Sequence, residues 1–263
     1  MSKIVKFILP LMLFIVIGFS HYTDNPIVSF EPFFKKNDSS GIIPPFPTLT
    51  DFDNEILRIC GNWGSQPDEK DFRILLDDPQ YQTIVQRIYN ALDHQVITPN
   101  ADLELFKDEL IHIWFTNSGI EKETVGFTHI FCGQPDKHGL GGMHFVGRYV
   151  EAQKNKWAGA IWDNRFICSK TDIKPPVYTL GIQYLDPADG EIKVKCPGGY
   201  AYNLHADDIL IFASTAFKEL GKDGMCLYKI ENDNYESLFI RHNGAILTFY
   251  PDLTPHGSCT CTH

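Results

Sequence analysis

Apolar side chains recur at three- and four-residue spacing in the first half of the chain, a period typical of amphipathic helices. Over residues 79–94 they predict one helix, whose buried face would hold Tyr81, Ile84, Val85, Ile88 and Leu92. Residues 100–119 predict another, with Asn100 as its N-cap, acidic residues in its first turn and Gly119 at its end. Residues 50–120 are therefore expected to form a helical N-terminal lobe.

The second half of the chain has the short apolar runs and turn residues of β-structure. Strands are expected over five stretches: residues 177–185, 192–195, 225–230, 237–241 and 245–250, the last ended by Pro251. The first two flank a strong turn at 186–190 and form a hairpin. Residues 208–213 are apolar almost throughout and fit a buried strand or a helix.

Residues 1–20 are typical of a secretory signal. Lys3 and Lys6 precede an apolar run from Phe7 to Phe19, and small residues follow at the positions of a cleavage site. A membrane span needs about twenty apolar residues, so an uncleaved anchor helix is the less favoured alternative. The mature protein is expected to be secreted or periplasmic, without stable membrane insertion after signal cleavage.

Four further segments follow the signal. Residues 21–49 are rich in proline and predict a linker or a strap over the domain surface. The helical lobe at 50–120 comes next, then a β-rich region at 121–256 and a short tail at 257–263.

Composition places the chain among globular proteins and limits its partners. It has 263 residues, of which 43% are hydrophobic, enough to bury a full core. The formal net charge is −10, and loss of Lys3 and Lys6 with the signal takes it to −12. A chain this acidic is not a general polyanion binder, because its field repels phosphates, but an enzyme that holds a short substrate remains compatible.

The chain has seven cysteines: Cys60, Cys132, Cys168, Cys196, Cys226, Cys259 and Cys261. Export permits disulfides, yet the number is odd and a chain of this size does not require them. Cys259 and Cys261 have the wrong spacing for a zinc knuckle, which favours a surface pair or a mobile end.

The richest candidate chemistry lies between Gly126 and Arg148, where three histidines surround a glycine-rich run. Alternation predicts a strand over residues 127–131 with His129 on one face. Gly139, Gly141 and Gly142 predict a turn, after which His144 begins a new element that is more helix-like than strand-like. The expected result is two imidazoles, those of His129 and His144, brought to one place.

Two imidazoles support general acid–base catalysis, because one ring accepts a proton while the other donates one. A lysine at the same place would hold an oxyanion or a phosphoryl oxygen. Cleavage of RNA by its own 2′-hydroxyl needs such a set. A metal site is less favoured, since no carboxylate or further histidine stands at ligand spacing from either histidine. Spacing alone leaves a second interpretation open, in which both histidines are ordinary strand and loop residues that are hydrogen-bonded to the backbone.

Four patches, in order, resemble the EndoU endoribonuclease family over roughly residues 100–255. They are Phe127-Thr128-His129-Ile130, Leu140-Gly141-Gly142-Met143-His144, Lys195-Cys196-Pro197-Gly198 and Thr248-Phe249-Tyr250-Pro251. The two histidines stand fifteen residues apart, as in the family, and residues 138–144 most resemble its coronavirus uridylate-specific members. Each patch is weak alone, and their order makes the combination fairly specific.

The resemblance implies an α+β fold in which a helical lobe precedes two antiparallel β-sheets that flank a catalytic cleft. It implies His144 as the general base, His129 as the general acid and Lys195 as the group that neutralises the phosphorane. Lys193 lies on the same face of the strand and is the alternative lysine. Products would be 2′,3′-cyclic phosphate and 5′-hydroxyl ends, formally a lyase reaction on RNA and not on DNA. Manganese dependence recurs in part of the family, although no ligand set shows in this sequence.

The resemblance also implies substrate contacts and two departures. Tyr250 would stack on the ribose or base, and Thr248, on the same face of its strand, would hydrogen-bond a base. Thr128 stands where the family often has a glutamate that orients the first histidine. Gly199 stands where the family often has a serine that reads uracil, so a looser preference for uridine among pyrimidines is expected. Arg148 is expected either to contact phosphate or to be solvated.

Two rival functions remain open from the sequence. One is an exported module of the same fold that binds RNA or protein without cutting, and the other is a nuclease toxin that acts on a competitor or host cell. The acid, base and cation set disfavours the first, because a binding surface does not need it.

Overall fold

The computed structural model describes residues 29–119, 123–136, 139–162, 168, 172–230, 235–253 and 260–261. The expected signal at residues 1–20, the histidine at 138 and the cysteine at 259 lie outside them. No helix in the described ranges has the length and apolar character needed to cross a bilayer.

Helices fill the first lobe, as predicted. They are α1 (Asp51–Cys60), α2 (Glu69–Asp77), the 3₁₀ turn η1 (Pro79–Tyr81), α3 (Gln82–Ala91) and α4 (Leu103–Phe115). The prediction of Asn100 as N-cap of α4 was wrong, since Asn100 has a positive φ of 54°. Asp102 caps the helix instead and accepts from the Leu105 N–H at 2.9 Å.

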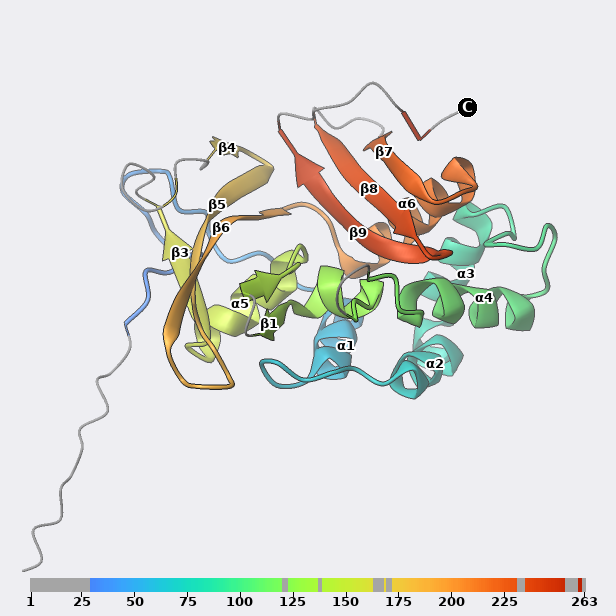
Figure 1. The fold of residues 1–263 in the computed structure, drawn as a ribbon, viewed down its shortest axis with the longest axis horizontal. Helices are drawn as coiled ribbons and strands as arrows, with labels where there is room; N and C mark the ends of the chain where they lie inside the picture. The colour runs from blue at the N-terminus through green and yellow to red at the C-terminus, as the bar shows by residue number, and fades with distance from the viewer. Residues whose placement is uncertain are drawn as a thin grey trace, which may run out of the picture.

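Three antiparallel sheets follow. In the largest, β5 (Val177–Leu185) pairs with β3 (Ala158–Ile161) and β4 (Asp172–Lys174) along one edge and with β6 (Ile192–Ala201) along the other. A meander holds β7 (Gly224–Lys229), β8 (Glu236–His242) and β9 (Ala245–Asp252). The smallest is the hairpin of β1 (Gln134–Asp136) and β2 (Gly139–Gly141). Figure 1 shows the two larger sheets side by side, with the helical lobe to the lower right. The α+β class with a helical lobe and antiparallel sheets is confirmed.

The structure settles one ambiguous point of the β-rich region and shows that one prediction, the end of the last strand at Pro251, was wrong. The apolar run at 208–213 belongs to helix α6 (Ala206–Leu220), which packs on the β7–β9 sheet. Pro251 does not end its strand, because β9 continues to Asp252. A proline is tolerated there because β9 is an edge strand of its sheet.

The strand predicted over residues 127–131 is instead helical. Thr128–Cys132 form a π-helical turn, η2. Phe127, Ile130 and Phe131 are fully buried, and their three- and four-residue spacing puts them on one helical face. Apparent alternation failed because residues on either side of His129 are also buried, which leaves His129 as the partly exposed member of the turn.

The proline-rich segment is packed on the domain over its described part. Phe33 and Phe34 are buried in the core. The Gln153 side-chain amide, on α5 (Val146–Lys154), exchanges two 2.9 Å hydrogen bonds with the Phe34 backbone. Residues 29–49 therefore lie as a strap along this side of the protein.

Three disulfides join described cysteines: Cys60–Cys132, Cys168–Cys196 and Cys226–Cys261. The expectation that Cys261 lies in a surface pair or a mobile end was wrong, because its bond to Cys226 anchors the tail to β7. Sequence could not show this, since the partner is 35 residues away and brought near only by the fold.

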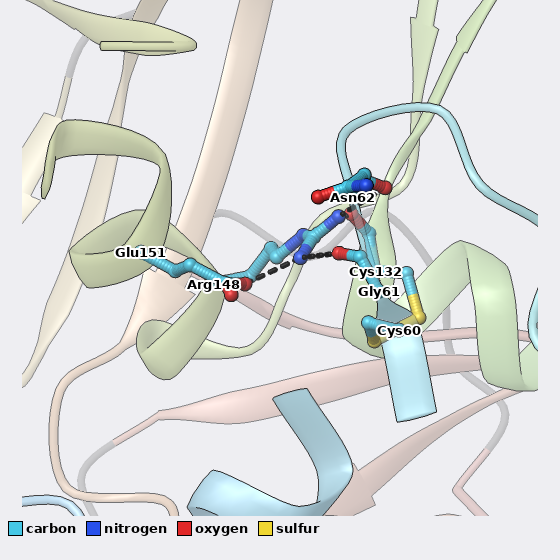
Figure 2. Close-up of a disulfide and its surroundings, with 6 residues drawn as sticks. All are labelled: Cys60, Gly61, Asn62, Cys132, Arg148 and Glu151. Carbon is cyan, nitrogen blue, oxygen red and sulfur yellow. Dashed lines mark hydrogen bonds and ion pairs between the residues drawn. A yellow bond between two sulfur atoms is a disulfide. The ribbon is translucent and has the colours of Figure 1, made fainter. Parts of the chain in front are cut away.

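Arg148 lies in α5 and is fully buried, so both expectations for it were wrong. Its Nε donates to the Cys132 carbonyl at 2.9 Å and its Nη1 to the Gly61 carbonyl at 2.9 Å. Glu151, one turn further along α5, accepts a charge-assisted hydrogen bond from the same Nη1. Figure 2 shows this guanidinium between Glu151 and the backbone of Gly61, next to the Cys60–Cys132 disulfide. The Arg148 side chain, on α5, thus connects η2 with the end of α1 in the helical lobe.

Replacing Arg148 by Met is expected to destabilise the protein by about 3 kcal/mol or more. The change leaves buried carbonyl oxygens unpaired and removes the partner of Glu151. Arg58→Met is the matched control, since Arg58 pairs with Glu55 one turn away but its side chain is 53% exposed, and its loss should cost under about 0.5 kcal/mol. Urea unfolding of the two variants measures both values. Equal losses would contradict a structural role for Arg148.

Candidate functional site

Backbone hydrogen bonds bring the two predicted histidines together. The Met143 N–H donates to the His129 carbonyl at 2.7 Å, and the His144 N–H donates to the Ile130 carbonyl at 2.8 Å. Gly142, with a φ of 62°, makes this possible, because a Cβ there would lie 1.8 Å from the His129 carbonyl oxygen. The imidazole centroids stand 5.7 Å apart. The glycine-rich turn thus places the two rings side by side, as the sequence predicted.

The Nδ1 atom of each imidazole faces an oxygen of the protein. His144 Nδ1 lies 3.3 Å from the Gly199 carbonyl oxygen, which only accepts hydrogen bonds. Nδ1 therefore carries the proton of the neutral ring and Nε2 keeps a free lone pair, the form that a general base requires. His129 Nδ1 lies 3.1 Å from Gln134 Oε1. Gln134, on β1, was missed from the sequence, because the hairpin alone brings it to the ring.

The surroundings of His144 favour its neutral form. Burial is the largest cause that lowers its pKa well below the ordinary 6.5, followed by the positive charges of Lys195 and of His129. The bond to the Gly199 carbonyl opposes this effect and is weaker. His144 is therefore neutral, and able to accept a proton, at neutral pH.

Position separates the two candidate lysines on β6. The Lys195 ammonium donates to the Gly142 carbonyl, between the two histidine segments. The Lys193 ammonium binds Asp186 and also Asp189, the latter at 2.9 Å, and these hydrogen bonds raise its pKa. Lys195 is thus the lysine beside the imidazoles.

Strand β9 supplies the opposite side of the site. The Tyr250 ring stacks on His144, with centroids 5.1 Å apart and planes 26° apart. Thr248, two residues earlier on the same face, is buried, and within the described ranges its hydroxyl has no hydrogen-bond partner. Phe249 points to the other face and is part of the core. The predicted alternation of β9 therefore holds.

All six candidate residues line one cavity of about 840 Å³ between β6 and β9. Its walls are His129, Leu140, Gly141, Gly142, His144, Asp172, Thr179, Lys195, Pro197, Gly198, Gly199, Thr248, Tyr250, Pro251, Asp252 and Leu253. The volume lies within the range of small-molecule sites. Two imidazoles, an ammonium group and a stacking ring thus share one space, which suits proton transfer with charge stabilisation.

A metal ion finds no built site in the described part of the chain. There, no group of three or more His, Cys, Asp or Glu side chains converges to hold one. Within the described ranges, no such group of ligands matches the manganese dependence that the resemblance implies.

Comparisons with known proteins give a family match and a similarity of fold. Residues 123–253 match the family model described as bacterial EndoU nuclease. Among solved structures, the fold is similar to that of XendoU, described as a splicing independent snoRNA processing endoribonuclease. The TM-score is 0.51 at 16% identity, over 78% of this chain and 77% of that one. A search of curated proteins gives no significant match.

The pKa of His144 is expected to rise when the neighbouring positive charge is removed. Lys195→Met deletes a cation that disfavours imidazolium, so the ring should protonate at higher pH than in the wild type. Lys193→Met is the control, because that ammonium is bound to two carboxylates. An NMR titration of the histidine rings in each protein measures the shift. A pKa of His144 at or above 6.5 in the wild-type protein would contradict the effect of burial on this ring.

Proposed function

The chain belongs to the EndoU nuclease family through residues 123–253, and on this premise we propose that it is an endoribonuclease. It cleaves single-stranded RNA by transphosphorylation, with a preference for pyrimidines and above all uridine. The observation that carries the proposal is the convergence of His129, His144 and Lys195 on one cavity. The similarity of the fold to that of XendoU, described as an endoribonuclease, supports the same class of reaction.

The reaction begins at the 2′-hydroxyl of the nucleotide before the scissile bond. His144 Nε2 accepts the hydroxyl proton while the 2′-oxygen attacks phosphorus. The Lys195 ammonium stabilises the negative charge that develops on the phosphorane oxygens. Protonated His129 gives its proton to the departing 5′-oxygen. A 2′,3′-cyclic phosphate and a 5′-hydroxyl result without the entry of water, so the reaction is of lyase type.

Substrate contacts follow from the same walls. Tyr250 presents its ring beside His144, where it stacks on the ribose or base of the attacking nucleotide. Thr248 offers a buried hydroxyl to the base, and Gly199 offers backbone. These contacts hold a short RNA segment and do not depend on a basic surface, which the net charge of −10 does not favour.

Export is part of the proposal. The amino-terminal pattern supports a secretory signal, and three disulfides fit an oxidising compartment. We place the mature enzyme outside the cell or in the periplasm.

RNA with one 2′-deoxy sugar at the cut site is expected to resist cleavage. The nucleophile is the substrate's own 2′-hydroxyl, which DNA and the modified RNA lack. Gel analysis of the two oligonucleotides, with and without manganese, and mass spectrometry of the ends, measure cleavage and its chemistry. Cutting at the deoxy position, or 3′-phosphate ends formed without a cyclic intermediate, would refute this mechanism.

His129→Ala, His144→Ala and Lys195→Ala are each expected to lower kcat/KM by about a hundredfold or more. The first two remove an acid or base and the third removes charge stabilisation in the transition state. Lys193→Ala is the matched control and should stay near the wild-type rate, because Lys193 is paired with Asp186 and Asp189. Rates of cleavage of one uridine-containing oligonucleotide compare the four variants. Loss in the Lys193 variant alone would assign the role to the other lysine.

A further inference from the structure

The wall of the cavity at Gly199 has no room for a side chain. A Cβ at this position would lie 2.9 Å from the Tyr178 carbonyl oxygen and 3.4 Å from the Thr179 Cα, both on the neighbouring strand β5. The contact with the Tyr178 carbonyl oxygen is too short for a Cβ, and because that oxygen belongs to the backbone, a side chain here would require the strands to move apart. Close approach of β5 and β6 therefore demands glycine here, and a hydroxyl on this part of the wall must come from another residue.

Thr179 supplies one. It is the paired partner of Gly199 across the β5–β6 ladder, so the two residues face the same side of the sheet. Its side chain lines the same cavity, and its Oγ1 lies 3.6 Å from the place that a Cβ at Gly199 would take. Within the described ranges, no other residue hydrogen-bonds to this hydroxyl.

The position of Thr179 relative to His144 decides which part of the substrate it meets. Gly199, beside Thr179, holds the His144 ring through its carbonyl oxygen. The nucleotide whose 2′-hydroxyl His144 deprotonates thus lies next to this wall. Resting on the proposed function, we infer that the Thr179 hydroxyl contacts the base of that nucleotide and is a specificity-determining group of the site.

Hydroxyl chemistry predicts which bases this contact accepts. A threonine hydroxyl donates one hydrogen bond and accepts others, and it rotates to suit its partner. It can accept from the N3–H of uracil or donate to the N3 of cytosine. Thr248 offers a second hydroxyl to the same cavity. Two rotating hydroxyls therefore take both pyrimidines, and the wild-type rates for uridine and cytidine should lie within about tenfold of each other, one weak hydrogen bond apart.

Three RNA substrates test the inference, each with a single cleavable ribose that carries uracil, cytosine or no base. Thr179→Val keeps the shape of the side chain and removes the hydroxyl. It should lower kcat/KM about tenfold for the uridine and cytidine substrates, the effect of one lost hydrogen bond, and leave the abasic substrate unchanged. Thr179→Ser retains the hydroxyl and should stay close to wild type.

Thr83→Val, on the exposed face of α3, is the control for a threonine-to-valine change away from the cavity. An equal loss on all three substrates would overturn the inference, because a merely structural residue affects cleavage with or without a base. Wild-type rates for Thr179→Val on both pyrimidines would overturn it too. Failure of the wild-type protein to cut any of the substrates would instead refute the proposed function.

Discussion

The geometry of the site depends on the buried guanidinium of Arg148. This residue stands four positions after His144, at the start of α5, and its Nε holds the carbonyl of Cys132, three positions after His129. The two histidine segments are thus linked twice. One link is this Arg148 hydrogen bond, and the other is the backbone hydrogen bond from Met143 to His129, which the close approach of Gly142 permits. Because Arg148 also donates to the Gly61 carbonyl, it connects the end of α1 in the helical lobe to the two histidine segments.

A buried charge is a costly way to join three segments, and its surroundings show why it is tolerated here. The guanidinium lies within 5.7 Å of the Trp63 ring centroid and 5.1 Å of that of Trp157, and Glu151 balances its charge. Its fork of donors reaches the carbonyls of Cys132 and Gly61, at the ends of η2 and α1. It also reaches the Asn62 carbonyl, which accepts from the Ser65 N–H as well. The Cys60–Cys132 disulfide restrains two of the same segments covalently. Non-covalent and covalent links therefore fix one geometry together.

Sequence patterns predicted what depends on neighbours along the chain. The helical lobe, the β5–β6 hairpin, the meander and the pairing of His129 with His144 by a glycine-rich turn all have local signals. Residues whose role depends on the path of the folded chain were missed or misjudged: Gln134, which the hairpin turns back to His129, the buried Arg148 and the disulfide of Cys261. Each acts through a contact that the tertiary fold creates. The helical turn at His129 was misjudged for the same reason, since burial on several faces erased the period that distinguishes helix from strand.

Lys195 links the two halves of the proposed chemistry, and its effects pull in opposite directions. In the proposed mechanism its charge stabilises the phosphorane, yet the same charge lowers the pKa of His144 and makes that imidazole a weaker base. A weaker base remains unprotonated over a wider pH range, so at a given pH a larger fraction of the protein has His144 in its neutral form. The Gly199 carbonyl partly restores the basicity of the ring through Nδ1. The proposed mechanism therefore balances oxyanion stabilisation against base strength through two groups on a single strand, β6: the Lys195 ammonium and the Gly199 carbonyl.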